Sequence, residues 1–255
     1  MSLSDLALAE LLAEAAGQAI RPWFRRPFLV ETKEDFSPVT IADREAEAAI
    51  RRLLDQYRPD DGVIGEEYGD DRPDAERVWV LDPIDGTRAF VAGRPLFGTL
   101  IGLMEQGQPV LGIIDQCIIG DRWLAAPGQP TLLNGARVHV RHCASLAQAR
   151  IGTTSPQAFD AADFRCFERV RVGAGDTLYG GDCHNYGLVA AGHLDAVVES
   201  GLKLHDWAAL VPIITGAGGV ITDWQGAPLT TASRGAVIAA GDPALAAAIA
   251  QMLAG

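Results

Sequence analysis

The chain has 255 residues, 48% hydrophobic and 21% charged, which is enough to bury a sizeable core as one large domain or two interlocked smaller ones. A formal net charge of −12 argues against a nucleic-acid partner, because phosphate backbones select basic surfaces. No apolar run approaches the roughly 20 residues that span a bilayer, so no membrane partner is expected. The four cysteines form no C-x-x-C pair, which indicates reduced thiols in a cytoplasm and argues against structural zinc.

The first part of the chain predicts two helices. Residues 4–20 are rich in Ala and Leu at helical spacing, and Pro22 should end this helix. Residues 31–38 are polar and turn-prone, which favours an exposed loop or hairpin. A second helix is expected from about Ile41 to Tyr57, with an apolar stripe for burial.

Asp43 falls in the first turn of the second predicted helix, three residues after Thr40. This spacing is typical of a capping arrangement, in which Thr40 is the N-cap and the helix dipole favours the acidic side chain. A second interpretation makes Asp43 a carboxylate directed at a metal. The segment alone leaves both interpretations open.

Glu66 follows an apolar, strand-like pair of residues and is itself followed by Glu67. Adjacent glutamates usually form a solvated edge. If the segment is extended, neighbours face opposite ways, so only one of the two can face a metal. We expect that one to be Glu66.

Residues 79–88, Trp-Val-Leu-Asp-Pro-Ile-Asp-Gly-Thr-Arg, are the most informative segment. The apolar run before Asp82 predicts a buried strand that delivers this carboxylate at its carboxyl end. Pro83 cannot donate a ladder hydrogen bond and should end the strand. A turn would then bring Asp85 toward the same point as Asp82.

Gly86 and Thr87 follow these two carboxylates. Gly86 has no Cβ to obstruct a ligand, and free N–H groups at the start of a short helix can hold a phosphate oxygen. Carboxylates hold hard divalent cations. The segment therefore predicts a place where metal and phosphate meet, although Asp residues that only cap a turn would give the same pattern.

The rest of the chain predicts mixed α and β structure in layers. Strands are expected at 97–104, 110–115, 194–199, 220–223 and 236–240, with helices near 186–191, from about 206, and from 243. Asn134-Gly135 marks a tight turn. We expect an N-terminal subdomain (1–140) that carries most of the metal ligands and a C-terminal α/β subdomain (141–255), packed as one unit.

Asp206 begins the late helix, where helix capping is again the simple explanation. Several acids at element termini beside a phosphate-type turn together suggest a multi-metal site.

Four motifs also stand in the order of a known family: Ser-Pro-Val-Thr-Ile-Ala-Asp (37–43), Gly-Glu-Glu (65–67), Asp-Pro-Ile-Asp-Gly-Thr (82–87) and His-Asp-Trp-Ala-Ala (205–209). Over nearly its whole length the chain resembles the Mg²⁺-dependent, lithium-sensitive inositol monophosphatase superfamily.

The resemblance implies an α+β fold, the layered αβαβα sandwich of the inositol monophosphatase and fructose-1,6-bisphosphatase type, commonly dimeric. It also implies two or three Mg²⁺ ions per active site, for which Mn²⁺ could substitute. The implied metal ligands are Glu66, Asp82, the carbonyl of Ile84, Asp85 and Asp206.

The same resemblance implies that Asp43 and Thr87, together with Glu66, position and deprotonate the attacking water. The backbone of Gly86 and Thr87 would hold phosphate oxygens. No nucleophile in the sequence demands a phospho-enzyme, and the histidines lack zinc-hydrolase spacing.

The organic half of the substrate should be recognised outside the metal cluster. Arg88 with residues 89–95, and Tyr-Gly-Gly-Asp-Cys-His-Asn-Tyr-Gly (179–187), resemble the histidinol-phosphate phosphatase branch. Histidinol phosphate carries cationic groups, so a pocket lined by Asp182 and Glu199 would suit it. A turn residue and a solvated arginine are the simpler explanations of Asp182 and Arg88.

The leading hypothesis is a phosphomonoesterase that hydrolyses L-histidinol phosphate in histidine biosynthesis. An inositol-1-phosphate or broad sugar-phosphate monophosphatase is the alternative. A metal-binding module without turnover is a third, against which the presence of both Asp43 and Thr87 counts. The expected partners are a small phosphate ester and a second copy of the chain.

Overall fold

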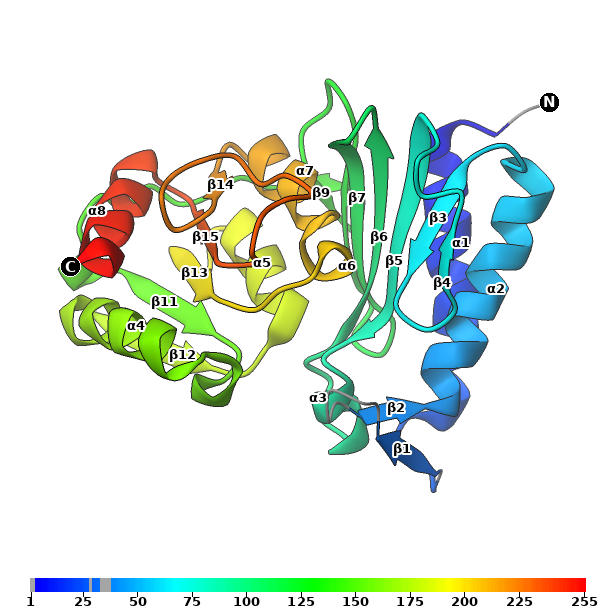
Figure 1. Cartoon of the computed structure of the whole chain (residues 1–255), viewed down its shortest axis with the longest axis horizontal. Coiled ribbons are helices and arrows are strands. Elements are labelled where there is room, and N and C mark those ends of the chain that lie inside the picture. The colour runs from blue at the N-terminus through cyan, green and yellow to red at the C-terminus, as the bar shows by residue number, and fades with distance from the viewer. Residues whose placement is uncertain (1–2, 28, 33–37) are drawn as a thin grey trace.

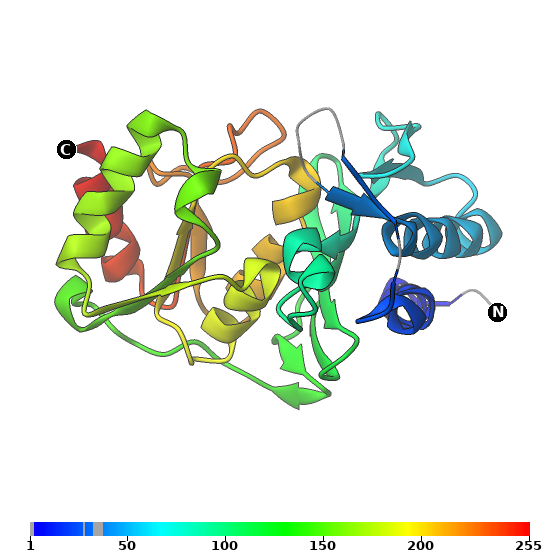
Figure 2. The ribbon, with the colours of Figure 1, turned by 90° about the horizontal axis from the view of Figure 1, so that it is seen from below.

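The computed structural model describes residues 3–27, 29–32 and 38–255. They form five layers, which run from right to left in Figure 1 as helix, sheet, helix, sheet, helix, and stay distinct in the perpendicular view of Figure 2. The mixed, layered architecture expected from the sequence is confirmed. The helices of the three helical layers are α1 (Asp5–Ile20) and α2 (Ile41–Tyr57); α5 (Asp182–Ala190), α6 (Leu204–Trp207) and α7 (Leu210–Gly216); and α4 (Ala161–Gly173) and α8 (Pro243–Ala254).

The larger sheet has eight strands in the order β10-β9-β8-β7-β6-β5-β3-β4. The β3–β5 pair is parallel and the other neighbouring pairs are antiparallel. In chain order the strands are β3 (Gly62–Gly65), β4 (Gly69–Asp71), β5 (Arg77–Asp85), β6 (Gly98–Glu105), β7 (Gln108–Gln116), β8 (Asp121–Ala125), β9 (Leu132–Leu133) and β10 (Ala136–Arg137).

Strand β5 shows why this sheet is covered on both faces. Trp79 and Leu81 belong to the apolar cluster formed with α1 and α2, whereas Val78 and Val80 belong to the cluster formed with α5 and α7. Successive strand residues point to opposite faces, so an unbroken apolar run is the pattern of a strand buried on both sides. The run therefore fixes β5 in the middle of the molecule.

The smaller sheet has five strands in the order β12-β11-β13-β15-β14. Strand β11 is parallel to β12 and β13, and β15 is antiparallel to β13 and β14. One face packs on α4 and α8, and the other turns toward α5 and α7 (Figure 1). The strands are β11 (Arg150–Thr153), β12 (Asp176–Tyr179), β13 (Ala196–Glu199), β14 (Val220–Thr222) and β15 (Val237–Ala240).

Shorter elements complete the described chain. They are the five-residue helix α3 (Thr87–Val91), the strands β1 (Val30–Thr32) and β2 (Pro38–Thr40), and the 3₁₀ turns η1 (Arg21–Trp23), η2 (Leu146–Gln148) and η3 (Pro156–Ala158). Each main sheet comes from one stretch of chain, on either side of residue 140. The division into subdomains at that residue stays a prediction.

Strand β5 does not end at Pro83 but continues to Asp85 through an irregularity in its pairing with β6. The helix expected from about 206 is two short helices, α6 and α7, with the break just before the segment that contains Pro212. Strands β1 and β2 pair antiparallel, and residues 33–37 of the predicted loop or hairpin, which come between them in the sequence, lie outside the described residues.

None of the helices in the described ranges is both long enough and apolar enough to cross a membrane.

Candidate active site

The site lies where the carboxyl ends of the parallel strands β3 and β5 meet the N-termini of α2, α3 and α6. Strand β5 pairs with β6 at Asp82–Leu100 and again at Asp85–Gly98, so β5 has one residue more than β6 between these pairs. In a regular strand, residues three apart face opposite sides, and one extra residue removes that difference. The bulge therefore turns Asp82 and Asp85 toward the same point, and Pro83 within it has no N–H to leave unpaired.

Acidic side chains converge at this bulge in two groups of potential metal ligands. One group is Asp82, Asp85 and Asp206, and the other is Glu66, Asp82 and His205, with the ligand atoms of each group within 4.8 Å of one another. Asp82 is common to both. The structure thus brings together the four side chains predicted from the sequence as metal ligands.

Burial and mutual repulsion disfavour charge in this cluster. Burial, followed by the charges of Glu66, Asp85 and Asp206, raises the pKa of Asp82 well above its usual range. The pKa values of Asp85 and Asp206 are also raised, in both cases mainly by burial. A bound cation would remove this cost, which is what a carboxylate site prepared for a metal should show.

The Ile84 carbonyl, the fifth predicted ligand, accepts a hydrogen bond from Thr87 Oγ1 at 3.0 Å. The backbone N–H of Ile84 donates to Asp82 Oδ1 at 3.1 Å and orients that carboxylate. Thr87 therefore stands between the bulge and the start of α2, where Asp43 lies.

Asp43 is fully buried, and its two oxygens have different partners. Oδ2 accepts hydrogen bonds from the backbone N–H and the hydroxyl of Thr40, at 2.9 and 2.6 Å, which completes a capping box at the start of α2. Oδ1 faces Thr87 Oγ1 at 3.4 Å. Burial raises the pKa of Asp43 to about 6, with a further contribution from the charge of Glu66.

Gly86 forms the turn between β5 and α3, with φ = +90°. A Cβ at this position would come within 2.9 Å of Asp182 Cγ. The missing side chain therefore makes room for the Asp182 carboxylate, which comes from α5 and packs directly on the turn. Burial, then the charge of Glu199, raises the pKa of Asp182 to about 7, while Arg94 lowers it.

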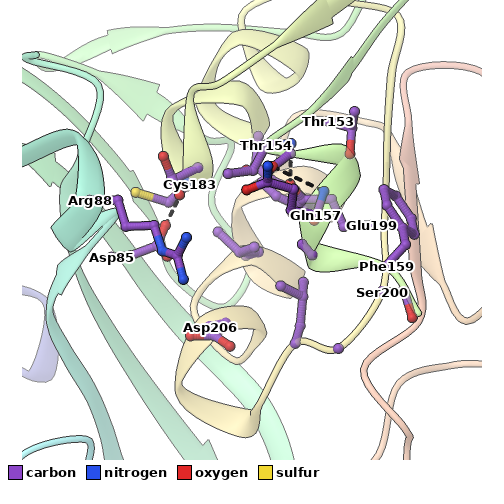
Figure 3. A pocket seen from close by; sticks show the side chains of 17 residues that line it. Asp85, Arg88, Thr153, Thr154, Gln157, Phe159, Cys183, Glu199, Ser200 and Asp206 are labelled. Carbon is purple, nitrogen blue, oxygen red and sulfur yellow. Dashed lines mark hydrogen bonds between the residues drawn. The ribbon is translucent and has the colours of Figure 1, made fainter. Parts of the chain in front are cut away.

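A cavity of about 290 Å³ opens beside this turn and contains three predicted substrate-binding residues. Arg88 lies with Asp85 at one end of the cavity, and Phe159 and Ser200 lie at the other (Figure 3). Glu199 is held inside by Thr154 N–H and Tyr186 O–H, each at 2.8 Å.

Several site residues were not among the sequence-based predictions. His205 is adjacent to Asp206 in the chain, and that adjacency was the available signal. The N–H of Cys183 donates to Asp85 Oδ2 at 2.5 Å, and Phe159 forms a cavity wall through a contact between distant segments. Glu66, the glutamate that was expected to face a metal, belongs to the potential metal group with Asp82 and His205, but it stands in the turn between β3 and β4 and not in an extended segment.

The sequence profile described as the Inositol monophosphatase family matches residues 3–254. The chain belongs to this family. An inositol monophosphatase from Zymomonas mobilis, whose structure has been solved, is 52% identical, with a TM-score of 0.91 over 98% of this chain and 97% of that one.

Curated relatives include both histidinol-phosphatases and inositol monophosphatases. A chloroplastic bifunctional phosphatase of Arabidopsis thaliana is 47% identical over 92% of this chain and 71% of its own. A histidinol-phosphatase of Chlorobaculum parvum is 38% identical over 87% of this chain and 86% of its own. Family membership supports phosphomonoesterase activity for a chain with the layered fold described above. The acidic groups that could bind a metal lie in the candidate active site.

Proposed function

We propose that the protein hydrolyses L-histidinol phosphate to L-histidinol and phosphate, with Mg²⁺, as a step of histidine biosynthesis. The observation that carries this proposal is the position of Asp182. Its carboxylate lies against the Gly86 turn and inside the cavity. An acid at that point is unfavourable for a phosphate alone and suits a phosphate ester with a cation close to the phosphate.

Histidinol phosphate has such a cation, because its ammonium group is on the carbon next to the one that carries the ester oxygen. With phosphate at the N–H groups of Gly86 and Thr87, the ammonium would lie near Asp182 and Glu199. Inositol 1-phosphate offers only neutral hydroxyls there. A charge-assisted contact contributes roughly 1.5–3 kcal/mol, which corresponds to about a ten- to hundredfold preference.

The far end of the cavity also suits a heteroaromatic group. Phe159 is stacked on Phe167, with ring centroids 4.8 Å apart, which fixes its ring as a cavity wall. Ser200 donates its hydroxyl hydrogen to Asp163, so its oxygen remains an acceptor for an N–H group. A flat apolar face and an acceptor match an imidazole better than a polyol.

The carboxylates of Glu66, Asp82, Asp85 and Asp206 and the carbonyl of Ile84 would hold the metal ions, and Asp82 belongs to both groups of potential ligands. Oxygen donors of this kind fit Mg²⁺, and the nearby nitrogen of His205 is compatible with Mn²⁺. When bound, such ions make water a better nucleophile and neutralise charge on the phosphate.

The chain's own groups would then move one proton. Thr87 Oγ1 would orient the attacking water, and Asp43 Oδ1 would receive the proton that the water loses. As the new P–O bond forms, the ester P–O bond would break, and the leaving oxygen would take a proton from solvent water to give the alcohol. A base with a pKa of about 6 is suited to this at neutral pH. The capping bonds from Thr40 keep Asp43 Oδ1 turned toward Thr87.

The decisive test compares kcat/KM for L-histidinol phosphate and inositol 1-phosphate at pH 8 with saturating Mg²⁺. We expect at least a tenfold preference for histidinol phosphate. Asp182→Asn should raise KM for histidinol phosphate about tenfold or more and change hydrolysis of the uncharged ester much less. Equal or better kcat/KM on inositol 1-phosphate would reject the assignment and favour the alternative.

The alternative, an inositol-1-phosphate or broad sugar-phosphate monophosphatase, has its own support. The protein from Zymomonas mobilis, at 52% identity, is an inositol monophosphatase. The metal cluster and the Gly86 turn treat both phosphates alike, so these two substrates differ only at the cavity.

The metal proposal has a separate test. Asp85→Asn and Asp206→Asn should each lower kcat severely and weaken Mg²⁺ binding measured by calorimetry, since each removes a negative charge from the group of Asp82, Asp85 and Asp206. Excess EDTA should abolish turnover in the unmutated protein. Full turnover after complete removal of metal would exclude the mechanism.

We further propose a homodimer in a cytoplasmic compartment, on the basis of the family resemblance and the reduced thiols. Light scattering coupled to size exclusion should give twice the 27.0 kDa chain mass. A monomer at micromolar concentration that is fully active would contradict the dimer proposal.

A further inference from the structure

Glu47 is a fully buried carboxylate that the proposed reaction does not use. It lies on α2 four residues after Asp43, which places both side chains on the same face of that helix. A buried carboxylate is unfavourable unless it is paired and hydrogen-bonded, so its partners indicate its purpose.

Two hydrogen bonds join Glu47 directly to the turn that carries Glu66, and a third comes from Arg51, one turn further along α2. Oε2 accepts the backbone N–H of Glu67 at 2.8 Å, and Oε1 accepts that of Tyr68 at 3.2 Å. Arg51 Nε donates to Oε1 at 2.8 Å, and the same guanidinium donates to the carbonyl of Gly69. The carboxylate and Arg51 thus bind the backbone of the turn from Glu67 to Gly69.

Two glycines allow this approach. A Cβ on Gly65 would lie 2.1 Å from Glu47 Oε1, so the carboxylate can reach the turn only where residue 65 has no side chain. Gly69 ends the three-residue turn with φ = +71°, a conformation that favours glycine. The close contact between the Glu47 carboxylate and the turn therefore depends on glycine at position 65.

We infer that Glu47 is a positioning residue for the metal site. By holding two N–H groups next to Glu66, it fixes the Glu66 carboxylate relative to Asp82, and α2 thereby sets the separation of Asp43 from Glu66. The inference rests on the proposed metal role of Glu66. Residues that orient a metal ligand typically change metal affinity by 10- to 100-fold when they are replaced.

The experiment uses Glu47→Gln and Glu47→Asp. Gln keeps the length but replaces one acceptor by an NH₂ group, whereas Asp keeps the charge but is one methylene too short to reach both N–H groups. We expect both variants to raise the half-saturating Mg²⁺ concentration about tenfold or more, measured by calorimetry and by the Mg²⁺-dependent rise in Tm. Amide exchange at Glu67 and Tyr68 should accelerate in both.

Comparison of the two variants separates position from charge. If Asp binds Mg²⁺ as the unmutated chain does and Gln does not, the effect is the charge of Glu47 and the positioning role is wrong. Glu45→Gln is the matched control, because Glu45 lies on the exposed side of α2 and accepts a hydrogen bond from Trp23 instead. It should leave Mg²⁺ affinity unchanged.

Other outcomes are also decisive. Unaltered Mg²⁺ affinity in a folded Glu47→Gln protein would overturn the inference, even if Tm falls. If neither Glu47 variant folds, Arg51→Lys decides, because a lysine cannot bridge Glu47 and the Gly69 carbonyl as a guanidinium does. It should weaken Mg²⁺ binding in the same direction, and an unchanged affinity would refute the role. Absence of Mg²⁺ binding in the unmutated chain would instead refute the proposed metal site.

Discussion

Asp43 uses its two carboxylate oxygens for different purposes. Oδ2 caps α2 through Thr40, and Oδ1 faces the hydroxyl of Thr87. Asp206 is similar: Oδ2 accepts the N–H of Lys203 at 2.6 Å at the start of α6, while the side chain belongs to a potential metal group. A capping role and a site role are therefore compatible, since the cap fixes the direction of the second oxygen.

Thr87 is the residue whose hydroxyl links Asp43 to the bulge. Replacement of Thr87 by Val keeps its shape and removes that hydroxyl, so we expect kcat at saturating Mg²⁺ to fall about 10²- to 10⁴-fold with little change in KM. Thr87→Ser keeps the hydroxyl and should retain most of the activity. A Val variant as active as the Ser variant would show that the hydroxyl has no part in the reaction.

At the scale of elements, the site depends on irregular backbone. The bulge in β5 aligns Asp82 and Asp85, and the positive φ of Gly86 turns the chain from β5 into α3 within one residue. Because the Asp182 carboxylate fills the space where a Cβ would lie, this turn also connects β5 to α5.

The Gly86→Ala variant tests this connection. A left-handed alanine costs about 1–2 kcal/mol by itself, and here the new methyl group also meets Asp182. Gly128 is a matched control, with φ = +71° and no atom within 4 Å of an added Cβ, so Gly128→Ala should show the backbone cost alone. We expect Gly86→Ala to lower the free energy of unfolding more than the control does and to impair turnover. Equal losses in the two variants would mean that the close contact is unimportant.

Local sequence patterns predicted much of this architecture. Helix α2 agrees with its expected bounds, α1 with its expected end, and Asn134-Gly135 forms the turn between β9 and β10 with positive φ at both residues. The continuation of β5 beyond Pro83 was missed because the bulge depends on pairing with β6, which no local pattern specifies. The aromatic cavity wall at Phe159 was missed for the same reason, since it is created by packing between segments distant in sequence.

At the scale of the whole molecule, the site brings carboxyl groups together, and the rest of the fold does not neutralise their negative charge. Most members of the acidic cluster, together with Asp182 and Glu199, have raised pKa values, with burial as the main cause. A chain with a formal charge of −12 adds to this repulsion. The metal-free protein should therefore be strained at neutral pH, and a divalent cation should stabilise the fold as well as assist the reaction.

This gives a prediction for stability against pH. A carboxyl group whose pKa is raised on folding stabilises the fold below its unfolded pKa of about 3.9, and that stability is lost as the pH rises through the folded value. For Asp43 and Asp182 these folded values are about 6 and about 7. In EDTA, Tm should therefore fall by several degrees between pH 5 and pH 8.

Two kinds of titratable group have the opposite effect on stability, because they make the fold more stable as the pH rises. They limit the pH range over which the prediction applies. Surface acids with lowered pKa values, such as Glu14 and Glu168, favour folding as the pH rises, but only below about pH 5. Buried His184, whose pKa is lowered by burial, adds stability as the pH rises through about 6.5, but it is one group against several acids. Asp182→Asn should flatten the decline, and excess Mg²⁺ should raise Tm most at pH 8, where the cluster is most ionised. A metal-free Tm that is constant or rises from pH 5 to pH 8 would show that the fold does not disfavour the ionised form of these carboxylates.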